Sequence, residues 1–263
     1  MNMMPGVFTA HKKNGDIYYR ASITYKSKHI SLGSFDTEIS ANQAYEAAKE
    51  VLYSSLLIED YNTTTPLPFE KWVSLVNVRD NGMYIKNPIY IHKKYFVYYI
   101  DSTNHYTFDV DDLFYYSNHK IMKRGNYIFV SDFGMQINIL SRYGIKNYAV
   151  CGRDYIFKNG DDKDYRYKNI YIINKYYGVF KFTSQGVSKY KAIIHLNSNY
   201  VIGTYKTENE AAIAYNKTID FLKEQGINKD FNTNYVEISA IEYASIYTSI
   251  RISKKIRAKF RKK

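Results

Sequence analysis

Two basic side chains occupy equivalent places in two similar stretches of the chain. Arg20 lies in residues 19–23, which read Tyr-Arg-Ala-Ser-Ile, and Lys191 lies in residues 190–194, which read Tyr-Lys-Ala-Ile-Ile. A guanidinium binds phosphate or a guanine edge through two hydrogen bonds, whereas an ammonium acts as a point charge. Both stretches are typical of half-buried strands, so each cation is expected on the exposed side. The spacing therefore indicates two exposed strands able to bind a polyanion.

Further polar side chains are expected beside these cations. Strand alternation turns Ser22 and Thr24 outward with Arg20, and it turns His195 outward with Lys191. The core side then holds Tyr19, Ala21 and Ile23 in one strand and Tyr190, Ala192 and Ile194 in the other. An uncovered sheet with basic and hydroxyl side chains fits the DNA major groove, which is wide enough for a small sheet.

A third basic group lies in the last ten residues, seven of which are cationic: Lys254, Lys255, Arg257, Lys259, Arg261, Lys262 and Lys263. A flexible tail of this kind neutralises phosphates and releases counterions. The tail is therefore expected to contact nucleic acid of any base sequence. A solvated terminus without a ligand is the alternative.

Residues suited to metal binding are few. Cys151 is the only cysteine, which excludes intrachain disulfides and thiolate zinc sites. The six histidines show no His-x-x-x-His or similar ligand spacing. Asp161, Asp162 and Asp164 form an acidic cluster that either binds a cation weakly or makes a polar turn. We therefore expect no cofactor and no bound metal.

The elements that position Arg20 and Lys191 recur as a module. Residues 6–63 share an ordered series of matches with residues 178–233, about 170 positions later. In the first copy, residues 17–25 and 28–35 read as strands, and residues 41–52 have the apolar spacing of a helix. In the second copy, Thr207 and Glu210 form a capping box that opens the matching helix. Each module is predicted to be a three-stranded antiparallel sheet backed by one helix.

The module resembles the Apetala-two (ethylene-response-factor) DNA-binding domain. The matching residues are Gly-Val, aromatic-x-Ala-x-Ile, Leu-Gly-x-Phe and Ala-x-x-Ala-Tyr, in that order. The resemblance implies that Arg20 and Lys191 contact DNA. The usual tryptophans of the second and third strands are replaced by Tyr19, Tyr190, Ser31 and Val201, so the family's sequence preference does not carry over. The alternative for each module is a structural role in which it binds another protein.

Between the modules, residues 159–170 resemble the end of an HNH motif from phage and mobile-element homing endonucleases. They read Asn-Gly-Asp-Asp-Lys-Asp-Tyr-Arg-Tyr-Lys-Asn-Ile, where the family has an Asn-Gly-Asp turn, Asp-Asn-Arg and Asn-Leu. Residues 109–113 and 135–142 fit the upstream stretch that holds Leu-His-Arg. In those proteins an Apetala-two type domain often follows, as the second module does here. The resemblance implies a central ββα domain and a DNA backbone contact from Arg166.

The catalytic residues of an HNH site do not match. Such a site needs a histidine base, an asparagine that orients it and ligands for one divalent metal. In a gapless alignment, the base position falls on Phe157 and the preceding acid position on Ile156. The asparagine position falls on Tyr165 and the first histidine position on Ser141. A shifted alignment offers Asp154 and Tyr155, and a tyrosine with a pKa of about 10 is a poor base at neutral pH. We therefore expect no enzyme but a nuclease scaffold that has lost its active site.

An aromatic run lies in the strand-like residues 89–100, where Lys93 and Lys94 precede Tyr95, Phe96, Tyr98 and Tyr99. Aromatic side chains interleaved with lysines stack on the bases of single strands. A packed strand is the alternative. Residues 127–130 are similarly strand-like, and residues 237–252 look helical.

The overall charge agrees with a polyanionic partner. Lys and Arg number 37 against 25 Asp and Glu, which gives a formal net charge of +12 and a pI near 9.3. An AT-rich coding sequence, which favours Lys, Tyr, Asn and Ile, is the alternative source of this bias. Neither a secretion signal nor a membrane-spanning apolar run is evident. We expect a cytoplasmic protein, in the host cell if phage-encoded, with no membrane partner.

These observations predict an α+β chain in four parts. The parts are a first module (1–66), a degenerate ββα HNH-like domain (67–174), a second module (175–236) and a helix with a basic tail (237–263). The predicted function is binding of nucleic acid, preferably duplex DNA, by a phage-encoded homing-endonuclease relative without nuclease activity. One alternative is an inhibitor of host defence, of the anti-CRISPR or anti-restriction kind, that binds a protein or ribonucleoprotein. The other is a residual metal-dependent nuclease.

Overall fold

The computed structural model describes residues 3–261, and the chain forms an α+β fold. It divides into two compact units. The first contains residues up to Ile139 together with Asp161–Asn169, and the second contains Leu140–Gly160 and the residues from Ile170 onward. No helix among the described residues is both long and apolar enough to cross a membrane.

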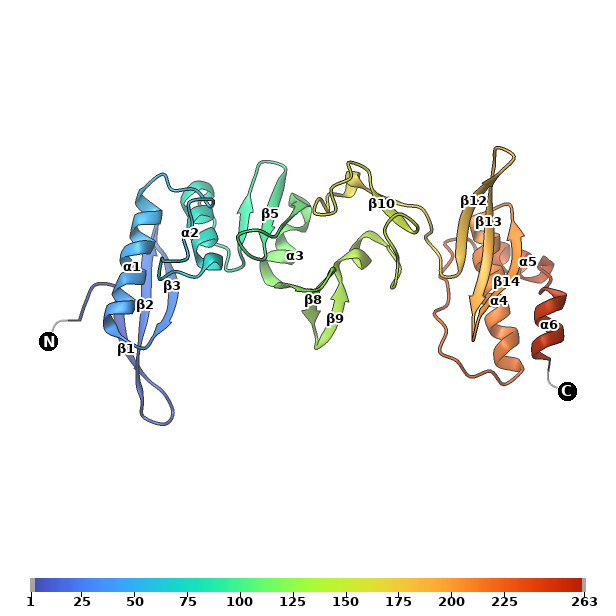
Figure 1. Ribbon diagram of the computed structural model, residues 1–263, viewed down its shortest axis with the longest axis horizontal. Coiled ribbons are helices and arrows are strands. Elements are labelled where there is room, and N and C mark those ends of the chain that lie inside the picture. Colours follow the sequence, from blue (N-terminus) through green and yellow to red (C-terminus); the bar gives the residue numbers. More distant parts are fainter. Residues whose placement is uncertain (1–2, 262–263) are drawn as a thin grey trace. The chain divides into compact units, whose positions relative to one another are not determined.

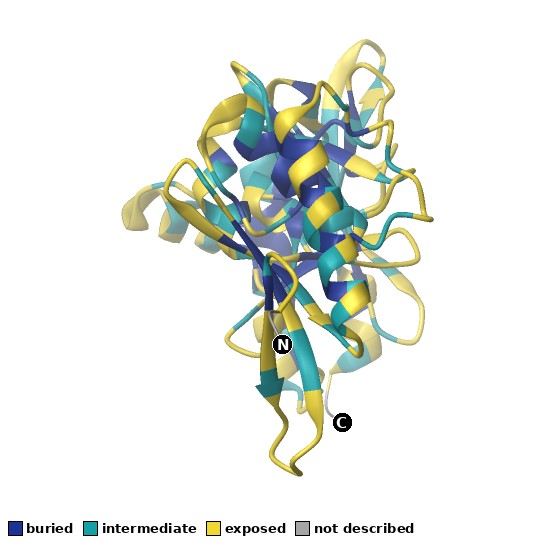
Figure 2. Ribbon diagram, turned by 90° about the vertical axis from the view of Figure 1, so that its left-hand side faces the viewer, coloured by how far each residue is buried: buried dark blue, intermediate teal, exposed yellow. Residues whose placement is uncertain are grey.

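The first module is an antiparallel sheet with one helix along it (Figure 1). The strands are β1 (Val7–His11), β2 (Ile17–Tyr25) and β3 (Lys28–Phe35), in that order, and the helix is α1 (Glu38–Tyr53). Figure 2 shows α1 buried on one side and exposed on the other; Ala41, Ala44 and Ala48 are on the buried side. These small side chains let the helix lie close to the sheet. The predicted strands and helix are confirmed.

The second module repeats this architecture. Its strands are β12 (Val179–Ser184), β13 (Val187–His195) and β14 (Asn199–Tyr205), followed by helix α4 (Glu208–Glu224). The capping box of Thr207 and Glu210 is present, as predicted. Both sheets carry a register shift at the same place, between Ala21 and Ser22 and between Ala192 and Ile193.

Two glycines explain why the Gly-Val and Ala-Tyr signatures recur together. Gly6 and Gly178 both have positive φ, and a Cβ atom on either would overlap the ring of Tyr45 or Tyr215. The carbonyl oxygen of each glycine also accepts a hydrogen bond from the second strand, at 3.0 Å in the first module and 2.7 Å in the second. The repeated residues therefore hold the helix, the first strand and the central strand together.

Helix α2 (Phe69–Asn81) completes the core of the first module. Trp72, Val73 and Leu75 are buried in the same apolar cluster as α1 and the sheet. Arg79 Nη1 donates to the carbonyl oxygens of Val51, Ser54 and Leu56 at distances between 2.7 and 3.1 Å. These bonds satisfy backbone acceptors at the C-terminal end of α1.

The rest of the first unit contains two further three-stranded antiparallel sheets. One consists of β4 (Ile89–Ile91), β5 (Tyr95–Tyr99) and β6 (His105–Asp109). The other consists of β7 (Ile121–Arg124), β8 (Tyr127–Asp132) and β9 (Met135–Asn138). Short helices also occur: η1 (Val110–Asp112), α3 (Leu113–Asn118) and η3 (Tyr167–Asn169).

In the central part of the chain, β10 (Tyr155–Phe157) pairs with β11 (Ile170–Ile172), and η2 (Ile139–Tyr143) precedes them. Residues 173–178, all described, contain no helix between β11 and β12. The chain therefore passes from this pair of strands directly into the second module, without the helix that a ββα unit requires.

Two helices follow the second module: α5 (Ala240–Ser249) and α6 (Lys254–Phe260). Ile256 of α6 is 1% exposed and belongs to the core of the module, against which Phe260 also packs. The expectation of a flexible basic tail is wrong for residues 254–260, because these two apolar side chains anchor the segment. Lys262 and Lys263 lie outside the described residues.

Candidate nucleic-acid interface

The strand register places the same three kinds of side chain across each sheet. In the first module, Arg20 lies between Phe8 on β1 and Ser34 on β3. In the second, Lys191 lies between Phe180 on β12 and Thr204 on β14. Cross-strand partners have Cβ atoms about 5 Å apart and share a face of the sheet. We call these two sets the cross-strand rows; each combines an aromatic ring, a cation and a hydroxyl group.

Sequence reasoning placed the cations of these rows but missed their neighbours. Phe8 and Phe180 both follow the repeated Gly-Val, and Ser34 and Thr204 both follow the glycine of the third strand. Each of these two pairs lies at equivalent positions in the two copies. The repeat is therefore the sequence signal that identifies these neighbours.

The outward face of the first sheet is largely as predicted. Arg20 and Thr24 are exposed, and Phe8 is 53% exposed. Ser22 corrects the prediction, because its exposure is only 8%. It is a short residue on the central strand at the register shift, where its N–H donates to the Gly6 carbonyl oxygen at 3.0 Å. The bulge and the flanking strands leave it little contact with solvent.

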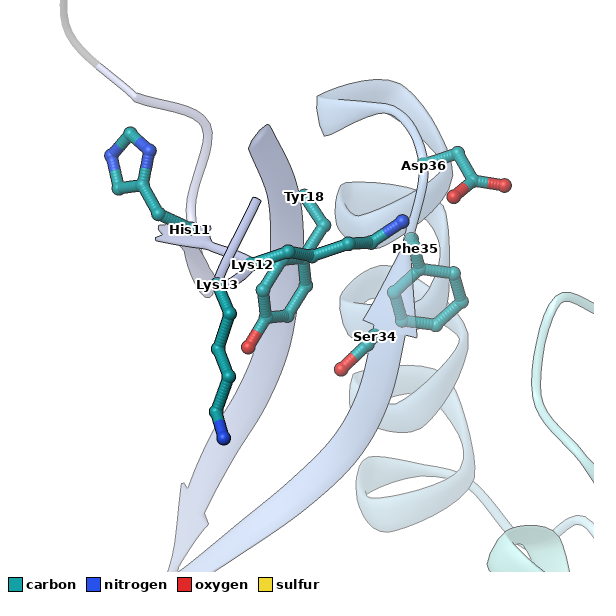
Figure 3. Close-up of a pocket in the computed structure, with 7 residues that line it drawn as sticks. All are labelled: His11, Lys12, Lys13, Tyr18, Ser34, Phe35 and Asp36. Carbon is teal, nitrogen blue, oxygen red and sulfur yellow. The ribbon is translucent and has the colours of Figure 1, made fainter. Parts of the chain in front are cut away.

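A shallow cleft of about 540 Å³ extends this face toward the turn between β1 and β2 (Figure 3). Tyr18 and Ser34, which neighbour Arg20 on the outward face, line it together with Lys12 and Lys13. Among the described residues lining it, Asp36 alone is acidic, and Figure 3 shows the Lys12 side chain extending in its direction. The cleft therefore adds cations to the first cross-strand row.

The outward face of the second sheet is more apolar. Lys191 is half-buried, and its Nζ atom lies 5.3 Å from the centre of the Phe182 ring. His195 is exposed, and its Nδ1 atom is 2.9 Å from Asn199 Oδ1. Val201, 53% exposed, occupies the same face. This face therefore offers less charge than the first.

Two cations from a distant segment border this second face. Lys146 and Arg153 lie 5.9 and 5.6 Å from the centre of the Phe180 ring. Both also contact the fully buried carboxylate of Asp154, at 3.0 and 2.7 Å. Sequence reasoning missed both, because nothing local in residues 146–153 indicates the proximity of β12.

Asp154 is a structural carboxylate. Burial raises its pKa, but hydrogen bonds from Arg153, the Val150 N–H and Lys146 outweigh that effect and hold the pKa below its usual value. Burial lowers the pKa of Lys146. Asp154, which a shifted HNH alignment offers for catalysis, is thus engaged in an ion-pair network.

Helix α6 separates the predicted tail cations into two groups. Lys254, Arg257 and Arg261 line a cleft of about 470 Å³ together with Phe221 and Gln225. Lys259 lies elsewhere, with its Nζ atom 4.7 Å from the centre of the Tyr200 ring. Lys255 is exposed and does not line the cleft. The structure therefore brings together three of the five predicted tail residues that it describes.

Arg166 forms an ion pair within the first unit. Its Nε and Nη2 atoms donate to the two carboxylate oxygens of Asp164 at 2.8 and 2.6 Å, and these bonds raise its pKa. Asp164 is therefore engaged by an arginine. Within residues 3–261, no group of three or more His, Cys, Asp or Glu side chains is arranged to hold a metal ion.

Two of the four positions that the HNH resemblance assigns to catalytic residues, those of the base and of the asparagine, hold buried aromatic side chains. Phe157 and Tyr165 are 9% and 6% exposed. Phe157 and Ser141 belong to the second unit and Tyr165 to the first. The side chains of Phe157 and Ile156 offer no atom that takes a proton or binds a metal, so these residues do not fit an HNH metal site.

Comparison of the chain with protein-family models, with curated proteins and with solved structures gives no match. The chemistry of the two sheet faces and of the basic clefts is therefore the basis for assigning a function.

Proposed function

We propose that this protein binds duplex DNA through the outward sheet faces of its two modules. The observation that carries this proposal is the repetition of the cross-strand row, on the sheet face opposite the helix in both modules. The cation supplies a phosphate or guanine contact, the hydroxyl group supplies a second hydrogen bond, and the ring adds apolar contact with the bases.

Additional cations support contacts with the phosphate backbone. Lys12 and Lys13 lie beside the first row, and Lys254, Arg257 and Arg261 share the cleft at α6. Each phosphate that a cation neutralises releases counterions and makes binding weaker at higher salt.

Fluorescence anisotropy with a labelled duplex tests the proposal. The logarithm of the binding constant should fall linearly with the logarithm of the salt concentration, with a slope of about −0.9 for each phosphate contact. Binding that does not change with salt would exclude DNA as the main ligand.

We further propose that the protein descends from a phage or mobile-element homing endonuclease and acts in the host cytoplasm without cutting DNA. Its support is the resemblance of both modules and of residues 159–170 to parts of such enzymes, combined with the buried Phe157 at the position of the base.

A second candidate function is inhibition of a host defence system through a protein or ribonucleoprotein partner. The exposed apolar side chains Phe8 and Val201, each 53% exposed, favour it because they lie on the proposed binding faces. Affinity capture from host lysate, with and without nuclease treatment, separates the two functions. A partner that survives nuclease treatment, and is lost on mutation of Arg20 and Lys191, would favour inhibition.

A further inference from the structure

One face of the sheet β4-β5-β6 carries aromatic residues that are only partly buried. Phe96 and Tyr98 of β5 are 0% and 1% exposed. Tyr95 and Tyr99 alternate with them and therefore lie on the opposite face. Both are only partly buried. One side of β5 thus packs the core, as the packed-strand alternative predicts, and on the other side Tyr95 and Tyr99 stay partly accessible while Val97 between them is buried.

Two clefts open on this accessible face, both formed within the first unit. One, of about 340 Å³, has aromatic walls that include Tyr61, Phe69, Tyr95, Tyr99 and His105. The other, of about 680 Å³, is lined by the cations Lys93, Lys94, Arg166 and Lys168, and by Tyr95 and Asp109. Tyr95 lines both, so an aromatic cleft and a basic cleft adjoin at one side chain.

The rings of the aromatic cleft are held in place by one another. Phe69 contacts Tyr99 edge to face, with ring centres 5.9 Å apart, and Tyr61 contacts Phe69 at 5.0 Å. Tyr95 is stacked on His92 with ring centres 4.4 Å apart. These rings are therefore already ordered before a ligand binds. Binding costs the protein little side-chain conformational entropy.

Charge distinguishes the two clefts. Lys93, Lys94 and Lys168 are exposed around the basic cleft. Arg166 keeps its guanidinium 5.4 Å from the centre of the Tyr95 ring while paired with Asp164. Glu59, by contrast, lines the aromatic cleft, where it would repel a phosphate. A ligand with a flat neutral ring and a phosphate is therefore oriented, with its ring toward Glu59 and its phosphate toward the lysines.

We propose that these adjoining clefts bind an unpaired nucleotide of single-stranded nucleic acid, with the base against Tyr95 and Tyr99 and the adjacent phosphate at Lys93 and Lys94. Paired bases are stacked within a duplex and do not enter such a cleft, whereas single strands present their bases to aromatic side chains. This site is separate from the cross-strand rows, which lie on other sheets, and does not depend on their function.

Anisotropy with a fluorescent oligothymidylate tests the proposal in the full-length protein. Tyr95→Ala should weaken binding of this single strand about tenfold through the loss of base stacking. Tyr95→Phe keeps the ring and should bind like the parent. The double variant Lys93→Ala with Lys94→Ala should also weaken binding, and more so at low salt. The matched controls are Phe114→Ala, at an 83% exposed ring of the same unit, and Lys86→Ala, at an exposed lysine outside both clefts.

Photo-cross-linking locates the contact. An oligonucleotide that carries 5-iodouracil should cross-link to the peptide containing Tyr95 and Tyr99. Binding of a duplex by Tyr95→Ala should equal that of the parent, which separates this site from the sheet faces. Single-strand binding that Tyr95→Ala leaves unchanged, or cross-links confined to the two modules, would overturn the proposal.

Discussion

At the scale of single residues, the two cross-strand rows are alike in position and unlike in chemistry. Arg20 is exposed, and a guanidinium can contact guanine through two hydrogen bonds. Lys191 is half-buried over Phe182 and acts as a point charge. Within the proposed DNA-binding function, the first module is therefore better suited to reading sequence, and the second to adding affinity.

We predict that Arg20→Ala reduces discrimination between DNA sequences by about 1–3 kcal/mol, because the guanine contact is lost. Lys191→Ala should weaken binding to all sequences by similar factors. Competition binding with a panel of duplexes measures both. Lys49→Ala, at a 54% exposed side chain on α1, is the control and should bind like the parent. Equal effects of Arg20→Ala and Lys191→Ala on discrimination would contradict this division of roles.

Gly178→Ala should destabilise the second module. A Cβ atom there would overlap the Tyr215 ring and the backbone oxygen of Ile193, and φ is +66°. Positive φ and overpacking together should cost at least about 2 kcal/mol of the free energy of unfolding. Urea unfolding measures this loss. The matched control is Gly186→Ala, where φ is +76° and the space around the Cβ position is open. It should cost about 1 kcal/mol, and equal losses would show that both the Tyr215 ring and the backbone at Ile193 can move aside.

At the scale of elements, Asp154 joins the segment before β10 to the chain after β11. Its carboxylate binds Lys146 and Arg153, and its carbonyl oxygen accepts hydrogen bonds from the N–H groups of Ile173 and Asn174 at 2.8 and 3.0 Å. The segment that borders the Phe180 ring is thus held by the carboxylate and the carbonyl oxygen of one buried residue.

Asp154→Asn should lower the free energy of unfolding by about 3 kcal/mol at neutral pH, because Lys146 then keeps a buried charge without its anion. The pKa of Asp154 is lower in the folded chain than in the unfolded chain. Its stabilising effect is therefore present above about pH 4 and lost as the pH falls further. Urea unfolding at several pH values should show the difference between parent and variant shrinking in acid. Glu46→Gln, at an exposed pair, should change stability by less than about 0.5 kcal/mol.

Helix α6 should contribute to binding and to stability through different side chains. Replacing Arg257 and Arg261 with Ala should weaken DNA binding and reduce the salt slope by about 2, since each phosphate contact contributes about 1. Ile256→Ala should instead cost about 2–5 kcal/mol of stability, because that side chain is 1% exposed in the core. Anisotropy and thermal unfolding, measured on both variants, distinguish the two effects. A salt slope unchanged by the double substitution would place the phosphate contacts elsewhere.

At the scale of the whole molecule, we predict that the protein leaves plasmid DNA uncut in the presence of magnesium or manganese. The position that the HNH resemblance assigns to the base is occupied by Phe157, which is 9% exposed. Incubation followed by gel electrophoresis checks this prediction. Metal-dependent cleavage that disappears when Asp161 and Asp164 are mutated would instead identify a residual nuclease. Phe157→His with Tyr165→Asn should restore little activity, because a metal ligand is still missing.

Local patterns in the sequence determined the elements of the two modules. The alternation of residues 17–25 and 28–35 predicted β2 and β3, and Thr207 with Glu210 predicted the start of α4. These features depend on neighbours a few positions apart, because strand period and helix capping are local properties. The repeat also identified Arg20 and Lys191 as equivalent residues, which their cross-strand partners confirm.

Only the tertiary structure decided which polar side chains are available to a ligand. Ser22 is buried at a bulge, Arg166 is paired with Asp164, and Lys254 shares a cleft with Arg257. Exposure and ion pairing depend on the backbone conformation and on which segments pack around each side chain, and strand period or charge counts contain no such information. For the same reason, the sequence determined that β5 would be aromatic, whereas packing decided that Phe96 enters the core and Tyr95 lines two clefts.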